Sequence, residues 1–197
     1  PEPEQLRDNL EAIDYRLIEM NRAEQRVQFH HPELNIDLGG IAKGHAVDSA
    51  IALLKTFGVT SALVSAGGDS RILGDRHGTP WIIGIKHPRD GDHFVVRIPL
   101  ENTAISTSGD YERFFIRDGE RIHHILNPST GKSASSVQSV TILADNAVDS
   151  DALSTTAFVL GIEKGLALIN RLPGVDAIII DADGRLHYSQ GLLRATQ

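Results

Sequence analysis

The sequence predicts an α+β fold in which antiparallel sheets pack with two long helices. Short runs of alternating residues are joined by turns at Asp118-Gly119 and Asp183-Gly184, which is typical of β-hairpins. Two longer stretches, residues 43–57 and 151–172, have helical patterns. Because hairpins outnumber strand–helix–strand units, the pattern favours α+β over an alternating α/β fold.

The first half of the chain is predicted element by element. Leu6, Leu10 and Ile13 have helical spacing, so we expect a helix over 3–13. Two alternating runs predict paired strands over 15–20 and 26–30. The helix over 43–57 ends well at Gly58. Further strands are expected over 60–65, 81–85, 93–98 and 103–107, with glycine turns over 66–69 and 90–92.

The second half continues with hairpins around one more helix. Strands are expected over 113–117 and 121–126, then over 136–143. The helix over 151–172 ends at Pro173-Gly174, and a last hairpin joins 176–181 to 185–189. No linker or repeat interrupts these elements, so residues 1–197 are predicted to form a single domain.

Composition excludes several classes of function. The net charge of -7 argues against a nucleic-acid-binding protein, which usually carries a basic patch. The absence of cysteine excludes disulfides, thiolate metal sites and cysteine nucleophiles. No uninterrupted apolar run approaches the roughly 18 residues of a membrane helix.

Asp151 and Thr155 form a candidate metal site at the expected start of a helix. They are four residues apart and therefore face the same side. A carboxylate and a hydroxyl are hard oxygen ligands of the kind that Mg²⁺ or Ca²⁺ takes. The alternative is that Asp151 only caps the positive end of the helix.

Two glycine-rich segments are candidate ligand sites. The segment from Asp37 to Asp48 enters a helix, where backbone N–H groups and Lys43 would attract phosphate, although it lacks the spacing of a P-loop. Gly67-Gly68-Asp69 follows a buried strand and would let a ligand approach the backbone closely. Both segments can also be read as ordinary turns.

Two polar segments complete the set. The segment from Thr107 to Glu112 offers hydroxyls that could hold phosphate or simply satisfy a turn. His123 and His124 precede the turn Asn127 to Gly131. A histidine there could act as a general acid or base near neutral pH, or be a hydrogen-bonded structural residue.

Taken together and in order, these segments resemble the ApbE family of FAD:protein FMN transferases. The motifs are Leu-Gly-Gly-Ile-Ala-Lys-Gly, Gly-Gly-Asp, Trp-Ile-Ile-Gly-Ile with His-Pro-Arg, Thr-Ser-Gly-Asp-Tyr-Glu, His-Ile-Leu-Asn-Pro-Ser-Thr-Gly and Asp-Ala-Leu-Ser-Thr. The resemblance covers about residues 4–191 and implies an ApbE-like (T-fold-like) version of the α+β fold.

The resemblance implies a reaction and a set of site residues. Such enzymes cleave the pyrophosphate of FAD with Mg²⁺, attach FMN to a threonine hydroxyl of a target protein and release AMP. Asp151 and Thr155 match the family's metal ligands, together with the backbone carbonyl of Gly40. Lys43 and His124 match its catalytic positions, with His124 as the acid or base that activates the threonine. The implied flavin-nucleotide site comprises Lys43, Gly67, Gly68, Asp69, Ser108, Gly109, His124 and Thr130.

The resemblance also carries expectations about context. The target would be a membrane-associated redox subunit, and the enzyme would be periplasmic or held by a lipid anchor outside this chain. Intact relatives carry a further segment before residue 1, so the chain is expected to be truncated at its N-terminus. The alternatives are an FAD pyrophosphatase that releases FMN and AMP, and a non-catalytic flavin- or metal-binding remnant. The oligomeric state is left open.

Overall fold

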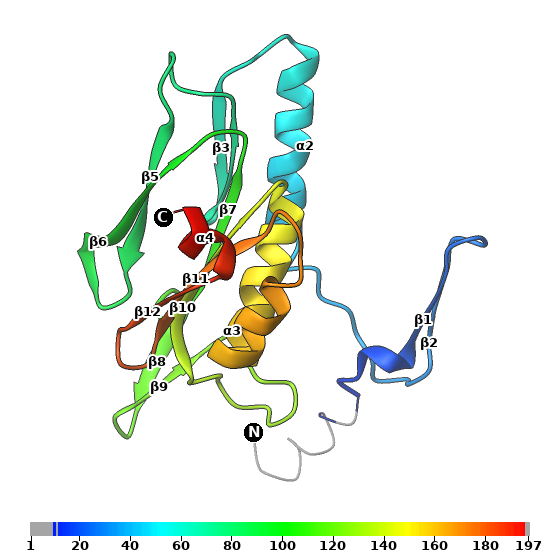
Figure 1. Cartoon of the computed structure of the whole chain (residues 1–197). Coiled ribbons are helices and arrows are strands. Elements are labelled where there is room, and N and C mark those ends of the chain that lie inside the picture. The colour runs from blue at the N-terminus through cyan, green and yellow to red at the C-terminus, as the bar shows by residue number, and fades with distance from the viewer. Residues whose placement is uncertain (1–9, 11, 196–197) are drawn as a thin grey trace.

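The centre of the molecule is a six-stranded antiparallel sheet with the order β12-β11-β10-β7-β4-β3. The computed structural model describes residue 10 and residues 12–195 (Figure 1). Every pairing in this sheet is antiparallel, which confirms the predicted α+β class. Its strands are β3 (Ala62–Ala66), β4 (Asp69–Leu73), β7 (Ala104–Gly109), β10 (Val137–Ala144), β11 (Asp176–Asp181) and β12 (Leu186–Tyr188).

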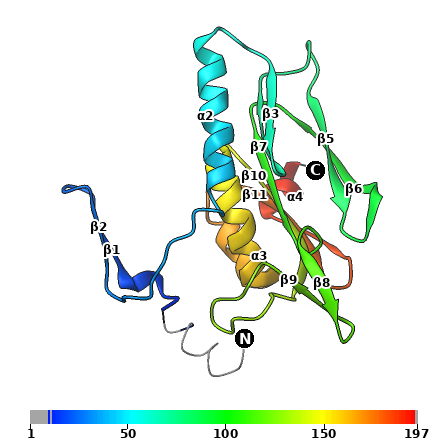
Figure 2. The same cartoon turned by 180° about the vertical axis from the view of Figure 1, so that it is seen from behind.

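Two long helices cover one face of the sheet, α2 (Ala42–Thr56) and α3 (Ala147–Ile169). Both views show α2 above α3 on that face, with the two helices meeting at their ends (Figures 1 and 2). α3 packs on β10 through a core that includes Val140, Ile142 and Phe158. By length and composition α3 could cross a membrane, with a mean hydropathy of 1.5. In this fold the apolar side of α3 packs into the hydrophobic core against the sheet.

The opposite face is covered by a long ribbon of β5 (Trp81–His87) and β6 (Asp90–Leu100) and by the short helix α4 (Gln190–Ala195). Ile72, Ile105 and Leu143 point from the sheet into this second core. The central strands are therefore buried on both faces, which explains why all of β10 is buried.

Two hairpins stand apart from the central sheet. β1 (Ile18–Asn21) and β2 (Arg26–Phe29) follow a short 3₁₀ helix, η1 (Tyr15–Leu17), and project away from the body in both views. β8 (Phe114–Arg117) and β9 (Glu120–His123) form a hairpin beside the end of β7. Most of the helix expected over 3–13 falls outside the described residues.

Some element boundaries were predicted wrongly, and each has a local cause. α3 begins at Ala147, because Asn146 accepts a hydrogen bond from the backbone N–H of Asp149 and caps the helix. Asp151 is therefore one turn inside the helix and does not cap it. Strand β4 was not predicted, because its residues Asp-Ser-Arg-Ile-Leu do not alternate between polar and apolar and its burial comes from tertiary contacts. α4, only six residues long, was also missed.

The turns around the sheet ribbons were also placed differently. Residues 90–92, expected as a separate turn, lie inside β6, because the reversal occurs at Pro88 and Arg89. Ser108 and Gly109, expected in a turn, pair with β10 as the end of β7. β9 ends at His123, short of the predicted residue 126; beyond it Ile125 is buried and Leu126 pairs with Ser133 through an isolated antiparallel bridge.

Candidate active site

A polar cleft of about 860 Å³ opens where the first turns of α2 and α3 meet the end of β7 and the segment after β9. Its size falls in the range of small-molecule sites. Most of the predicted site residues line it: Gly40, Lys43, Gly67, Ser108, Gly109, His124, Asp151 and Thr155.

Asp151 is the buried acid at the bottom of this cleft. Its side chain is only 3% exposed. One carboxylate oxygen accepts the backbone N–H of Gly44 at 3.0 Å, and the other lies 3.0 Å from the ammonium of Lys43. A buried carboxylate must be paired, and these two contacts from α2 are what hold it.

Lys43 joins Asp151 to a second buried acid, Asp69. The Nζ atom lies 2.5 Å from Asp69 Oδ2 in an ion pair. Burial alone would lower the pKa of Lys43, but the hydrogen bonds to Asp69 and Asp151 outweigh it and raise that pKa above its usual value. Burial raises the pKa of Asp69, an effect that Lys43 and Ser106 only partly offset.

A row of hydroxyls connects β7 to α3. Ser106 and Ser150 are bonded at 2.7 Å, and Ser108 lies 2.8 Å from Ser154 and 3.0 Å from Thr155. Thr155 is thereby oriented beside Asp151 on the cleft wall. Ser106, Ser150 and Ser154 were not predicted, although serines alternating on a strand and repeating every four residues on a helix are visible in the sequence.

The donor set suits Mg²⁺. Asp151, Thr155 and the Gly40 backbone border the same cleft, and carboxylate, hydroxyl and carbonyl oxygens are the ligands that hard cations prefer. Among the described residues no three His, Cys, Asp or Glu side chains gather as a metal site. That finding concerns a different donor set, because only one of the three candidate ligands here is such a side chain.

The contact between α2 and α3 fixes the position of Asp151. Asp48, on α2, accepts the backbone N–H groups of Ala147 and Val148 at 2.9–3.0 Å and pairs with Arg71 at 2.6 Å. One turn earlier Gly44 lies so close to α3 that an added Cβ would be 2.2 Å from the carbonyl oxygen of Ala147. The two helices therefore meet through backbone contact that only glycine permits.

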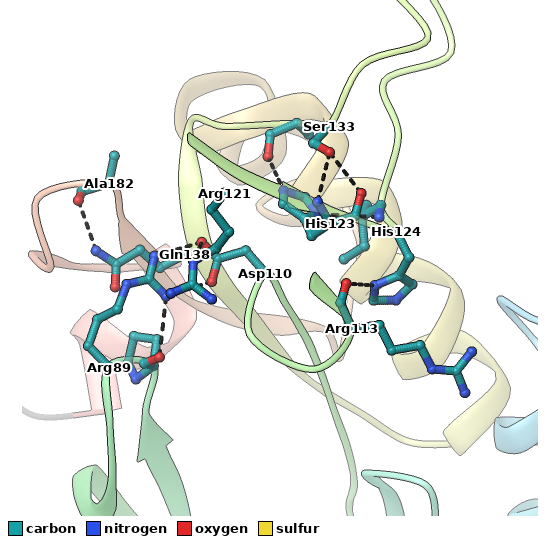
Figure 3. A network of polar contacts seen from close by, with 12 residues as sticks. Arg89, Asp110, Arg113, Arg121, His123, His124, Ser133, Gln138 and Ala182 are labelled. Carbon is teal, nitrogen blue, oxygen red and sulfur yellow. Dashed lines mark hydrogen bonds and ion pairs between the residues drawn. The ribbon is translucent and has the colours of Figure 1, made fainter. Parts of the chain in front are cut away.

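The two neighbouring histidines have different environments (Figure 3). His123 is buried, and its Nε2 lies 2.8 Å from the carbonyl oxygen of Ala134 while its Nδ1 accepts the N–H of Ile125. It is thus a structural histidine. His124 is exposed and lines the cleft; among the described residues its ring makes one long contact, 3.4 Å from Nδ1 to the carbonyl oxygen of Arg113, which also accepts the backbone N–H of His124.

An ionic network braces the outer end of β7 (Figure 3). Arg89, in the turn between β5 and β6, binds both oxygens of Asp110 at 2.7 and 2.6 Å, and Arg121 of β9 lies 3.9 Å from the same carboxylate. Asp110 directly follows Gly109 on the cleft wall. The network ties three separate sheets to the rim of the cleft.

The structure does not bring every predicted residue to the cleft surface. Asp69 lies behind Lys43, Gly68 borders no part of the cleft, and Thr130 is in the turn that starts at Asn127. Their binding role stays a prediction. The other lining residues are Asp37, Gly39, Thr107, Glu112, Arg113, Ile125, Leu126 and Val159, of which only Arg113 and Val159 lie outside the segments that the sequence singled out.

Fold and cleft together define an α+β protein that presents hard oxygen ligands beside a lysine and a histidine. The chain belongs to the ApbE family, whose model matches residues 1–179. This finding confirms the resemblance predicted from the motifs.

Curated and solved relatives support the same assignment. The chain is 38% identical over 209 residues to an FAD:protein FMN transferase of Treponema pallidum, covering 98% of this chain and 58% of that protein. It is similar to the crystal structure of the ApbE protein of Thermotoga maritima, with 40% identity and a TM-score of 0.89, covering 98% of this chain and 63% of that one. The apo flavinyl transferase ApbE of Pseudomonas stutzeri gives 32% identity and a TM-score of 0.83, with 98% and 61% covered. The chain thus spans about three-fifths of the length of these relatives.

Proposed function

We propose that this chain carries the catalytic cleft of an FAD:protein FMN transferase that works with Mg²⁺. The observation that carries the proposal is the convergence of Asp151, Thr155, Gly40, Lys43 and His124 on one cleft. These residues come from three separate segments of the sequence. Membership of a family whose relatives bear this name supports the same reaction.

In this proposal the buried end of the cleft binds the pyrophosphate. Asp151, Thr155 and the Gly40 carbonyl would hold the metal, which supplies charge neutralisation and alignment of the phosphates. Lys43 adds a second positive charge beside them. Positioning and electrostatics dominate phosphoryl-type transfer, so fixed ligands at this end are the main requirement.

The exposed end of the cleft would receive the acceptor. His124 takes the proton of the threonine hydroxyl while the threonine oxygen bonds to the phosphorus of the FMN half. The bond from that phosphorus to the bridging oxygen breaks, and AMP leaves with the bridging oxygen. General base catalysis by a histidine near neutral pH is well suited to this step.

The wider context is proposed on the family resemblance alone. The acceptor is a subunit of a membrane redox complex, and the enzyme works in the periplasm or on a lipid anchor facing it. Fractionation of the native host with an antibody against this chain would test the location, and a purely cytoplasmic signal would refute it.

Transfer is tested by incubating the protein with FAD, Mg²⁺ and an acceptor protein that carries the target threonine. The test is run on this chain and on the full open reading frame that encodes it. Mass spectrometry of the acceptor should show added FMN, with AMP released in equal amount. FMN and AMP in solution without a modified acceptor would indicate a pyrophosphatase instead, and absence of both products in both proteins would refute the enzyme.

Asp151→Asn tests the metal site. Loss of the buried carboxylate should lower Mg²⁺-dependent transfer by about 100-fold or more, since the metal supplies several kcal/mol of charge stabilisation. Asp183→Asn is the matched control, because Asp183 is exposed and its carboxylate pairs with the exposed Arg185. An Asp151→Asn enzyme with undiminished Mg²⁺ dependence would show that the ligand is assigned wrongly.

A further inference from the structure

Lys43 stands between two buried carboxylates that differ in their access to the cleft. Its Nζ lies 3.0 Å from Asp151 Oδ1 and 2.5 Å from Asp69 Oδ2. Asp151 borders the cleft, whereas Asp69 does not. The lysine side chain is 42% exposed and the two acids only 3% and 4%. A half-exposed cation is therefore shared by two buried anions.

The carboxylate oxygen that Lys43 contacts on Asp151 is the one left for a metal ion. The other oxygen, Oδ2, already accepts the backbone N–H of Gly44. An ammonium and a divalent cation cannot both neutralise Oδ1 without strong repulsion at this distance. Binding of a metal there requires Lys43 to give up Asp151.

Asp69 provides the place to which Lys43 can withdraw. Among the described residues its Oδ2 has no well-oriented hydrogen bond and forms an ion pair with Lys43, while Ser106 also interacts with the carboxyl group. The Nζ already lies closer to Asp69 than to Asp151. A small rotation of the side chain would complete the transfer while keeping Asp69 paired, as a buried charge requires.

We infer that Asp69 is a positioning residue that acts through Lys43 by drawing the ammonium away from Asp151 when Mg²⁺ binds. The inference rests on the proposed function, because it takes Asp151 as a metal ligand. Lys43 serves as the counter-ion of Asp151 in the metal-free protein and is held by Asp69 in the metal-bound one. Removing Asp69 would leave Lys43 no partner but the metal ligand itself.

The test is a double-mutant cycle read by isothermal titration calorimetry with Mg²⁺ alone, and circular dichroism confirms that each variant is folded. Lys43→Met, which removes the competing ammonium, should raise Mg²⁺ affinity by about tenfold. Asp69→Asn should lower it by about tenfold in the wild-type background. In the Lys43→Met background the same Asp69 change should alter affinity by less than about threefold, because the lysine through which it acts is gone.

Two charge-conserving variants serve as controls for this cycle. Lys43→Arg keeps the cation and should not reproduce the gain in affinity of Lys43→Met. Asp69→Glu keeps the anion and should hold the affinity within about threefold of wild type, which is a usable comparison if Asp69→Asn does not fold.

The inference is overturned if Asp69→Asn weakens Mg²⁺ binding equally with and without Lys43, since Asp69 would then act by its own field or by structure. It is also overturned if Lys43→Met lowers the affinity, or if neither wild type nor Lys43→Met binds Mg²⁺. The proposed function fails separately, in the transfer assay with FAD and an acceptor. The two failures can therefore be told apart. If FMN transfer keeps its Mg²⁺ dependence but Asp69→Asn has the same effect on Mg²⁺ affinity with and without Lys43, only the role of Asp69 is refuted.

Discussion

Two regions border the same cleft and are built in opposite ways. At the junction of α2 and α3, Asp151 is buried and held by backbone and side-chain contacts from α2. At the rim after β9, His124 is exposed and its ring has one long contact to a backbone oxygen. The first region is fixed by tertiary packing, and the second is left accessible.

The difference matches the demands of the proposed reaction. A metal site and a pyrophosphate need ligands already in place, because ordering them during the reaction would cost free energy. A large protein acceptor must instead reach the reacting phosphate from outside, so the group that takes its proton has to stand at an open edge. Changes in the junction should therefore alter stability and metal affinity together, whereas changes at the rim should alter rate alone.

Asp48→Ala is expected to have the largest effect on the junction. It leaves the N–H groups of Ala147 and Val148 without their acceptor and Arg71 without its partner. Breaking such a partly buried network should lower the free energy of unfolding by about 3 kcal/mol, as measured by urea denaturation. Mg²⁺ affinity should fall as well, because the first turn of α3 positions Asp151.

Asp183→Ala is the control for that variant, since it removes an aspartate paired with an exposed arginine. The control should lie within about 0.5 kcal/mol of wild type. An Asp48→Ala protein as stable as this control would show that the junction does not depend on the capping contact.

The neighbouring histidines give a second contrast between a buried and an exposed side chain, His123 in the core and His124 at the rim. His124→Ala should slow FMN transfer by about 100-fold, which is the lower range for loss of a general base, and leave the unfolding free energy almost unchanged. His123→Ala should lose about 2 kcal/mol of stability, because it removes two buried hydrogen bonds and the edge contact with Phe158. Its transfer rate per folded molecule should stay near that of wild type.

Stopped-flow or quenched transfer assays, paired with thermal unfolding, distinguish these outcomes. The comparison of rim and junction breaks down if His124→Ala transfers FMN at the wild-type rate. A fully stable His123→Ala protein would show that the buried ring contributes nothing to the fold.

The sequence predicted the elements better than their contacts. Local patterns were sufficient for the helix from Ala42 and for the hairpin around Asp118-Gly119, because helix period and turn chemistry are local properties. They placed the start of α3 wrongly, since Asn146 and Asp151 are both reasonable capping residues and only the folded chain shows which one caps. Strand β4 was missed because its burial comes from β7 and from the ribbon of β5 and β6, which are distant in sequence.

The candidate site was predicted from motif order and not from geometry. The motifs pointed to Lys43, His124, Asp151 and Thr155, which all line one cleft. The capping role of Asp48 on α3 spans 99 residues of sequence, so no local pattern reveals it. The pairing of Lys43 with Asp69 is likewise a product of tertiary structure. Motifs in the sequence therefore predicted the residues of the site, whereas the contacts that position these residues became visible only in the folded structure.

Gly44→Ala tests the junction by adding a single methyl group. Its Cβ would lie 2.2 Å from the carbonyl oxygen of Ala147 and 2.8 Å from the Cα of Val148, both backbone atoms that cannot rotate away. The helices must separate, at a cost of about 1–3 kcal/mol. Because the same movement lengthens the bond from Gly44 N–H to Asp151, Mg²⁺ affinity should fall in step with stability.

Gly91→Ala is the matched control, since nothing lies within 4 Å of an added Cβ there. Thermal unfolding and Mg²⁺ titration of both variants give the comparison. If Gly44→Ala loses stability but keeps wild-type Mg²⁺ affinity, the close approach of the helices serves the fold alone and not the metal ligand. Loss of both would mean that one glycine sets the distance between the helix that supplies Lys43 and the helix that supplies Asp151.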